Sequence, residues 1–285
     1  MTDAVVSLAD YDHFIALVKL RLGIDLGSGK AYLLQSRLQA IASTEGYRDV
    51  DALLHAIRIA PEPRFVDAAV DALTTNETLF FRDQVPFDQL KTLLAQIAAE
   101  RPKIPIRIWC AACSTGQEPY SIAMLVEEES SRLQGARVEI VATDVSPKCL
   151  EKARTGIYSQ FEAQRGLTIQ RLMRHFDQGP AGWTLKPALR AAVTWKRLNL
   201  LDDLRTMGQF DIVFCRNVLI YFERSRKQDV LSRVANQMRE GGTLFLGAAE
   251  TTFGLCAAFA AAGGAHGAHI KQAHVGSFPA VASAR

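Results

Sequence analysis

From residue 104 onward, short β-rich runs alternate with segments of helical spacing, and this alternation restricts the possible folds more than any other feature of the chain. The runs are IPIRIWCAA, VEIVATD, FDIVFC and GTLFLGA. Each of the first three is followed by a plausible helix, which is the arrangement of parallel strands joined by crossover helices. The pattern therefore predicts an α/β fold with a doubly wound sheet.

The first 73 residues have a different periodicity. Apolar side chains recur at helical spacing in successive stretches, at residues 11–22, 34–41, 50–57 and 65–73. A capping-box pattern beginning at Ser7 precedes the first stretch. We therefore expect a helical domain over residues 1–73, followed by a linker with a connecting helix over residues 74–100.

The α/β rhythm expected over residues 101–285 is interrupted at about residues 156–192. This segment contains the turn sequence GPAGW and a short TLKPAL run, which together predict a small insertion with hairpin-like elements. Further along the chain, we expect a helix from about residue 224 to residue 239. We interpret the Ala- and Gly-rich AAFAAAGGAHGAH as a loop or a helix end near the last strand.

Charge and hydropathy argue against several classes of function. The net charge is +3, but residues 1–80 hold seven Lys and Arg against eleven Asp and Glu, and no segment forms a basic block. Nucleic acid is therefore a disfavoured partner. No run approaches the roughly 18 apolar residues of a membrane span, and the start has no basic segment leading into an apolar core. We expect a cytoplasmic protein without membrane insertion, with its five scattered cysteines reduced.

Polar and small residues follow the predicted strands, at the edge where α/β sheets bind ligands. The turn AACSTGQEPYS with Gly116 follows the first strand, Asp144 ends the second, and CRNVLIYF follows FDIVFC. Gly116 can let the backbone approach a ligand, and Asp144 can accept hydrogen bonds from two ribose hydroxyls, although each also has a structural alternative as a tight turn or a helix cap. Because the turn has one glycine where dinucleotide-binding turns have three, the pattern favours a nucleoside ligand.

Three segments together carry a resemblance to a known family: TTNETLFFRD at residues 74–83, CSTGQEPYS at 113–121 and FCRNVLIYF at 214–222. In order and spacing they resemble the glutamate O-methyltransferases of chemotaxis receptors, the CheR family. The resemblance implies a class I S-adenosylmethionine (SAM) methyltransferase with an N-terminal helical domain and a small β insertion. It also implies methyl transfer to glutamates on the cytoplasmic helices of methyl-accepting chemotaxis receptors, with S-adenosyl-L-homocysteine as product, by a monomeric enzyme without a metal.

The same resemblance implies roles for individual positions. Contacts with the cofactor are implied for Asn76, Thr78, Arg82, Glu118, Asp144, Asn199, Leu200, Arg216 and Asn217. Catalytic roles are implied for Arg82, Tyr221 and Arg37. The structural alternatives are an interdomain salt bridge for Arg82, an aromatic core position for Tyr221 and a solvated helix position for Arg37. The sequence departs from the family pattern at Gln117, usually Glu, and at Ala249, usually Ser.

The chemistry of such a site requires orientation rather than a general base. A glutamate carboxyl has a pKa of about 4.3, so it is an anionic nucleophile at neutral pH. Its attack on a sulfonium methyl group neutralises opposite charges, and a desolvated site that holds the two reactants in line lowers the barrier. Arg82 is suited to aim the carboxylate, and Tyr221 is suited to hold either reactant.

Other interpretations remain open from the residues alone. The WCAAC run with Cys110 and Cys113 is similar to a dithiol redox site. A zinc site is disfavoured, because no second Cys or His pair occurs at zinc-ligand spacing. A SAM-dependent methyltransferase of another protein or a small molecule is the main alternative, and a regulatory module without turnover is another. DNA amino-methylating enzymes usually carry Asn/Asp-Pro-Pro-aromatic where this chain has RNVLIYF.

The insertion also bears on how a receptor would be recognised. The loop in FDQGPAGWTLK, residues 176–186, is short compared with family members that grip a tether peptide at the receptor's C-terminus. We therefore predict direct recognition of the receptor helices through the helical domain. That domain is acidic overall, so a complementary surface must be local, with Lys19, Lys30 and Arg37 as candidates.

Overall fold

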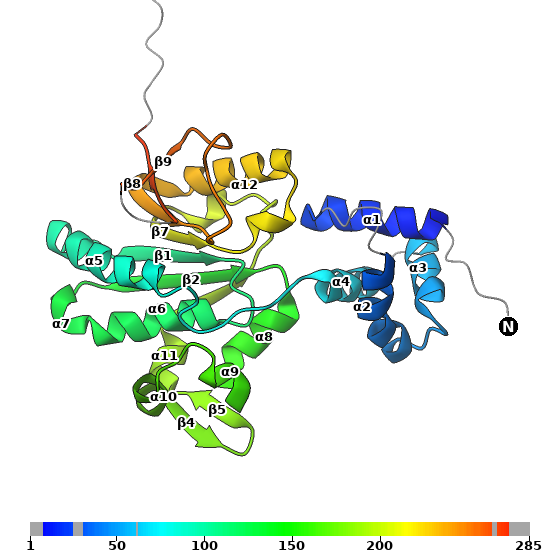
Figure 1. Ribbon diagram of the computed structural model, residues 1–285, viewed down its shortest axis with the longest axis horizontal. Helices are drawn as coiled ribbons and strands as arrows, with labels where there is room; N and C mark the ends of the chain where they lie inside the picture. Colours follow the sequence, from blue (N-terminus) through cyan, green and yellow to red (C-terminus); the bar gives the residue numbers. More distant parts are fainter. Residues whose placement is uncertain (1–7, 25–30, 61, 264–266, 274–285) are drawn as a thin grey trace, which may run out of the picture.

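The computed structural model describes residues 8–24, 31–60, 62–263 and 267–273. A group of N-terminal helices lies beside an α/β unit, and an extended segment joins the two (Figure 1). Among the described residues, no helix has the length and apolar character needed to cross a membrane.

The N-terminal helices share one apolar core. They are α1 (Leu8–Leu22), α2 (Ala31–Thr44), α3 (Val50–Ile59) and α4 (Pro63–Leu73). Phe14 of α1, Leu38 of α2 and Leu53 of α3 are buried in this core because their helical spacing places them on inward faces. Asp49 begins α3 by accepting a hydrogen bond from the Ala52 amide at 2.8 Å. The helical character predicted for this region is confirmed, whereas Ser7 lies outside the described residues.

A seven-stranded sheet forms the centre of the α/β unit, in the order β6-β2-β1-β7-β8-β10-β9. Its strands are β1 (Ile106–Ala111), β2 (Val138–Asp144), β6 (Val193–Arg197), β7 (Phe210–Cys215), β8 (Met238–Phe245), β9 (Phe259–Ala261) and β10 (Ala268–Lys271). The strands from β6 to β8 in this order are parallel, and β10 is antiparallel to both of its neighbours. The predicted doubly wound α/β fold is confirmed.

Two expectations for the C-terminal part need correction. The helix predicted from about residue 224 is present as α12 (Arg224–Asn236), but it ends before residue 239, because Met238 already belongs to β8 and pairs with Phe210 of β7. The Ala-rich segment contains β9 and the start of β10, on either side of residues 264–266, which lie outside the described residues. Hydrogen bonds to a neighbouring strand override the weak strand preference of Ala and Gly there.

Helices cover both faces of the sheet. Alternate residues of β1 point in opposite directions, so that Ile108 packs with α5 and α6 whereas Trp109 packs with α12. The remaining elements of this unit are α5 (Val85–Glu100), α6 (Gln117–Glu128), α7 (Ser130–Leu133), α8 (Pro147–Thr155), α11 (Pro187–Ala191) and the 3-10 turns η1 (Arg205–Met207) and η2 (Leu219–Tyr221).

A small subdomain, called here the insertion, lies between α8 and α11 in the chain. It consists of β3 (Ile157–Tyr158), α9 (Gln160–Gln164), α10 (Ile169–His175), β4 (Phe176–Gly179) and β5 (Gly182–Leu185). Its three strands form an antiparallel sheet in the order β3-β5-β4 (bottom of Figure 1). Gly182 has a φ of +116°, and a Cβ there would lie 2.4 Å from the Tyr158 carbonyl oxygen, so the hairpin requires glycine at this position.

Candidate cofactor-binding site

A cavity lies beyond the carboxyl ends of the parallel strands, where the α/β unit faces the N-terminal helices. One wall, called here the strand-end wall, is formed by residues at or after the ends of β1, β2, β6 and β7. A second wall is formed by residues 74–78 and Arg82 of the segment at residues 74–83, called here the connecting segment. Leu22 and Ile24 at the end of α1 complete the lining.

Asp144 ends β2 and is held by main-chain amides on both sides. Its Oδ2 accepts a hydrogen bond from Ser114 N at 2.7 Å, and its Oδ1 accepts one from Ser146 N at 2.9 Å. Burial raises the pKa of Asp144, and the hydrogen bonds from Ser146 and Ser114 oppose this rise. A carboxylate has about four acceptor positions, so Asp144 can accept further hydrogen bonds from a ligand in the cavity.

The turn after β1 is shaped by packing as well as by the cavity. Ser114 lines the cavity with a φ of +51°, and its Oγ donates to the Asn76 carbonyl oxygen at 2.8 Å, which joins this turn to the connecting segment. Gly116 is not part of the lining. A Cβ on Gly116 would lie 2.9 Å from Ala153 and Trp195 side chains, so this glycine allows α8 and β6 to approach the turn.

Glu118 and Arg216 form a buried ion pair in the same wall. Arg216 Nη1 donates to Glu118 Oε2 at 3.1 Å, and Nη2 donates to Asp83 Oδ2 at 2.7 Å and to the Arg82 carbonyl oxygen at 2.9 Å. Burial raises the pKa of Glu118, while the charge and the hydrogen bond of Arg216 act to lower it. Arg216 Nε is buried and has no hydrogen-bond partner among the described residues.

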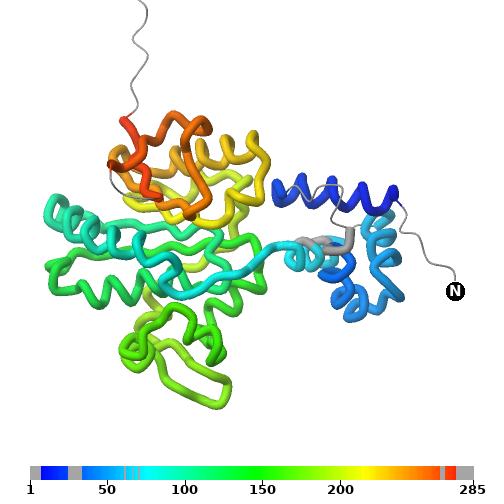
Figure 2. The backbone as a smooth tube through the Cα atoms, in the orientation of Figure 1, coloured from blue at the N-terminus to red at the C-terminus, as the bar shows by residue number. Residues whose placement is uncertain are grey.

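The connecting segment runs from the N-terminal helices to the α/β unit and lines the cavity on the way (Figure 2). Asn76 and Thr78 line the cavity, as does Arg82. The side-chain hydrogen bond that Arg82 makes within the described residues runs from Nη1 to the Glu77 carbonyl oxygen, at 3.2 Å. The rest of its guanidinium group is therefore available to a ligand or substrate.

The last group of lining residues follows β6 and β7. Asn199 and Leu200 come after β6, and Asn199 Nδ2 donates to the Arg21 carbonyl oxygen at 2.6 Å, so that it also touches the end of α1. Asn217 and Tyr221 come after β7, and Asn217 has a φ of +57°. Tyr221 is half-buried and faces the cavity instead of belonging to an apolar core cluster.

Arg37 alone among the predicted site residues does not line the cavity. Its Nη1 donates to the carbonyl oxygens of Leu73 at 2.9 Å and Thr74 at 3.4 Å, and its Nη2 donates to Thr75 Oγ1 at 3.4 Å. Thr74 and Thr75 are lining residues. Arg37 therefore contacts the back of the connecting segment and can influence the cavity through it.

Comparison with known proteins identifies the cofactor of this chain. Residues 76–267 match the SAM-binding domain of the CheR methyltransferases, and residues 9–74 match the all-α domain of the same proteins. The chain belongs to the CheR methyltransferase family. The resemblance stated from the sequence motifs is thereby confirmed.

Curated relatives agree over most of the chain. Chemotaxis protein methyltransferase Cher2 of Pseudomonas putida is 43% identical over 251 residues, which cover 86% of this chain and 91% of that protein. Chemotaxis protein methyltransferase 1 of Pseudomonas aeruginosa is 44% identical over 247 residues, covering 85% and 90%. The chemotaxis protein methyltransferase of Escherichia coli is 35% identical over 250 residues, covering 86% and 85%.

The enzyme is accordingly a SAM-dependent methyltransferase, and its cavity fits that cofactor chemically. Asp144 offers acceptor positions for hydroxyl groups, Glu118 offers negative charge to an ammonium or sulfonium group, and the guanidinium group of Arg216 offers positive charge to a carboxylate. The dithiol interpretation of WCAAC has no support, because Cys110 and Cys113 are both buried and burial raises the pKa of each thiol well above its usual value, whereas reactive thiols are exposed and have lowered pKa values. No cluster of metal-ligating side chains occurs in the described part of the chain.

Several lining residues carried no signal in the sequence. Leu22 and Ile24 belong to a helix end that looks like ordinary core, and they reach the cavity because Ile24 forms a β-bridge with Phe222. Ser114 lies within the CSTGQEPYS motif, but its residue type predicts no particular role. Its positive φ and its two hydrogen bonds depend on the neighbouring chain segments and could not be read from residue type.

Proposed function

We propose that the enzyme transfers the methyl group of SAM to glutamate side chains on the cytoplasmic helices of methyl-accepting chemotaxis receptors, giving glutamate methyl esters. The observation that carries the proposal is that Arg82 and Tyr221 line the same cavity as Asp144 and Glu118. Arg82, which is able to orient a carboxylate, thus lines the same cavity as the carboxylates that suit the cofactor. The names of the relatives, chemotaxis protein methyltransferases, support the choice of substrate.

The proposed cofactor contacts divide between the walls. Asp144 accepts from ribose hydroxyls, Glu118 and Arg216 bind the amino-acid end, and Asn199 and Leu200 lie beside the base. Asn76, Thr78 and Asn217 close the cavity around these contacts. All of these residues are in the lining, which supports the set as a whole.

In the reaction, bound SAM supplies an electrophilic methyl group on a sulfonium. The substrate carboxylate is already ionised at neutral pH, so no side chain has to remove a proton. Arg82 uses its free N–H groups to orient the carboxylate, and Tyr221 holds it from the opposite side of the cavity. A paired but not fully neutralised carboxylate keeps its nucleophilicity, and exclusion of water by the connecting segment strengthens the orientation.

The test is incubation with radiolabelled SAM and a purified receptor signalling domain. We expect base-labile label on the receptor, which is the behaviour of a methyl ester, and no label when the methylated glutamates are replaced by alanine. Label on another protein or on a small molecule alone would favour a different methyltransferase. Binding of SAM without any transfer would favour a regulatory module.

We further propose that the enzyme acts in the cytoplasm, as a monomer, and recognises receptor helices without a tether peptide. The tight hairpin between β4 and β5 supports this, because it leaves only residues 180 and 181 between the strands. The basic patch expected on the helical domain is only partly available. Lys30 lies outside the described residues, Lys19 is 2.8 Å from Glu223, and Arg37 is bonded to the connecting segment. Calorimetry with an isolated tether peptide tests this proposal, and micromolar binding that is lost when the loop is replaced would contradict it.

A further inference from the structure

The connecting segment turns sharply around Arg82. Phe81 has a φ of +49° and Asp83 has a φ of +55°, so two non-glycine residues on either side of Arg82 adopt the left-handed region. Side chains with a Cβ rarely adopt this region, and they persist there only when surrounding contacts determine the conformation. The contacts that hold this turn therefore decide where the Arg82 side chain lies.

Contacts from the α/β unit hold the main chain of the turn. Phe81 N donates to Ser121 Oγ of α6 at 2.9 Å, and Ser121 Oγ in turn donates to the Gln117 carbonyl oxygen at 2.6 Å. On the other side of Arg82, Arg216 holds the Asp83 carboxylate and the Arg82 carbonyl oxygen. These contacts leave the Phe81 ring to be held by other residues.

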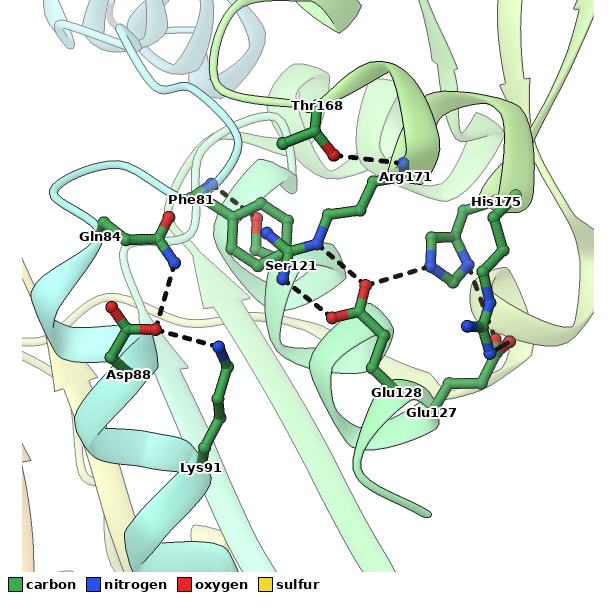
Figure 3. Close-up of polar contacts among 11 residues, drawn as sticks. Phe81, Gln84, Asp88, Lys91, Ser121, Glu127, Glu128, Thr168, Arg171 and His175 are labelled. Atoms are coloured by element: carbon green, nitrogen blue, oxygen red, sulfur yellow. Dashed lines mark hydrogen bonds and ion pairs between the residues drawn. The ribbon is translucent and has the colours of Figure 1, made fainter. Parts of the chain in front are cut away.

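The ring of Phe81 is covered by Arg171, which belongs to α10 of the insertion. Arg171 Cζ lies 3.7 Å from the ring centroid, and Figure 3 shows the guanidinium group over the ring and directed at Glu128. Arg171 Nε and Nη2 donate to the two carboxylate oxygens of Glu128 at 2.9 and 2.8 Å. A bidentate pair fixes the plane of the guanidinium group, so that its flat face stays against the ring.

The insertion also touches the connecting segment at neighbouring points. Arg165 Nη2 is 2.9 Å from Glu77 Oε1. Gly166 lies so close to the segment that a Cβ would be 1.8 Å from the Phe80 carbonyl oxygen. Arg171 therefore acts within a continuous contact between the insertion and the segment that carries Arg82.

We propose that Arg171 is a positioning residue for methyl transfer: anchored by Glu128, it clamps the Phe81 ring and so keeps Arg82 turned into the cavity. This inference rests on the proposed role of Arg82. It assigns the insertion a part in the rate of the reaction, separate from any contact that the insertion makes with a receptor.

An ordinary structural ion pair would behave differently from such a clamp. Loss of an ion pair lowers thermal stability and leaves the turnover of the folded enzyme unchanged. Loss of the clamp lowers kcat while the affinity for SAM stays nearly constant, because Asp144 and Glu118 keep their contacts and Ser114 still holds the Asn76 carbonyl oxygen. The same α10 helix offers a control in Arg174, whose Nη2 is 3.2 Å from Glu127 Oε1 and whose side chain is 56% exposed.

The experiment compares Arg171→Ala, Arg171→Lys and Arg174→Ala, with kcat measured on a receptor signalling domain, SAM affinity by calorimetry, and Tm. We expect Arg171→Ala to lower kcat by about tenfold or more with SAM affinity within about twofold, since small displacements of an orienting group are costly. Arg171→Lys keeps the charge but loses the flat, bidentate geometry, so its kcat falls as well. Arg174→Ala keeps the wild-type kcat.

A second substitution tests whether Arg171 acts through the ring. In a Phe81→Leu background the ring is absent, so Arg171→Ala should cause little further loss of kcat, giving a non-additive cycle. Additive losses, an unchanged kcat in Arg171→Lys, or equal effects of Arg171→Ala and Arg174→Ala would each overturn the inference. Absence of methyl transfer by the wild-type enzyme would instead refute the proposed function.

Discussion

Two walls of the cavity, the strand-end wall and the connecting segment, are built in different ways. In the strand-end wall, Asp144 ends β2, and its carboxylate accepts hydrogen bonds from the main-chain amides of Ser114, after β1, and of Ser146. The connecting segment has no regular secondary structure between α4 and α5. It is held instead by side chains from several other elements, among them Arg37 of α2, Ser121 of α6 and Arg171 of α10.

Because of this difference, we expect one wall to determine cofactor affinity and the other to determine the geometry of the reacting groups. A wall fixed by the sheet is organised before any ligand arrives, which favours affinity. A wall fixed by distant side chains changes position when any one of them is altered, which affects the geometry of the reacting groups. Substitutions in the strand-end wall should therefore change cofactor affinity, and substitutions around the connecting segment should change kcat.

The largest effect is expected for Arg82→Ala. Removing the group proposed to aim the carboxylate should lower kcat by about 100- to 1000-fold, the range seen when one preorganised electrostatic contact is lost. SAM affinity, measured by calorimetry, should change by less than about tenfold. Arg82→Lys, which keeps the charge, should retain an intermediate rate. An unchanged rate in Arg82→Ala would remove this residue from the site.

Asp144→Ala should have its main effect on affinity. Loss of charged acceptor positions for two hydroxyl groups costs about 3 kcal/mol, so the Kd for SAM should rise by about 100-fold. Asp203, an exposed carboxylate paired with Arg205 on the surface, provides the control, and Asp203→Ala should bind SAM as the wild type does. If calorimetry gave the same Kd for both variants, the strand-end wall would not be the wall that sets affinity.

A smaller effect is expected for Arg37→Ala, which acts only on the back of the connecting segment. Losing its hydrogen bonds to the Leu73 and Thr74 carbonyl oxygens costs about 1 kcal/mol, so kcat should fall about fivefold and SAM affinity less. Arg48→Ala is the matched control, because Arg48 is an exposed arginine of the helical domain that pairs with Asp49. A larger loss of SAM affinity than of kcat in Arg37→Ala would contradict the proposed division.

The smallest effect near neutral pH is expected from titration of Asp144 and Glu118, which changes the affinity for SAM. Burial raises the pKa of both Asp144 and Glu118, so in the free enzyme they begin to take up protons above the usual values of 3.8 and 4.5. A protonated carboxyl cannot offer negative charge to the ligand, so SAM affinity is complete above these raised pKa values and is lost as the pH falls through them. Calorimetry across acid pH checks the direction. Affinity that rises on acidification would show that neither group binds in its charged form.

The strand-end wall could be predicted from sequence because its geometry follows from the fold. Once alternating strands and helices predict a parallel sheet, residues such as Asp144 must lie at one edge, whatever the rest of the chain does. A tight turn at Gly116 could be predicted too, but the reason why the turn requires glycine could not. It accommodates Ala153 and Trp195, which come together only after the sheet and α8 have packed.

The conformation of the connecting segment could not be predicted from residue patterns. The motif at residues 74–83 identified the family, but the left-handed backbone at Phe81 and Asp83 depends on contacts with residues far along the chain. Arg171 is one of several arginines in the insertion, and only the folded structure places it against Phe81. Arg37 likewise acts on the cavity only indirectly, by hydrogen bonds to main-chain carbonyl groups of the connecting segment, which any sequence could provide.

The position of the cavity also bears on how this enzyme could be recombined with its relatives. The two family matches meet between residues 74 and 76, and Thr74, Thr75 and Asn76 are all lining residues. A fragment beginning at residue 76 would keep Asp144 but lose Leu22, whose side of the cavity would then be open to water. Exchange of the helical domain between two relatives, intended to redirect the enzyme to another receptor, would therefore also exchange part of the lining of the cavity proposed to bind the cofactor.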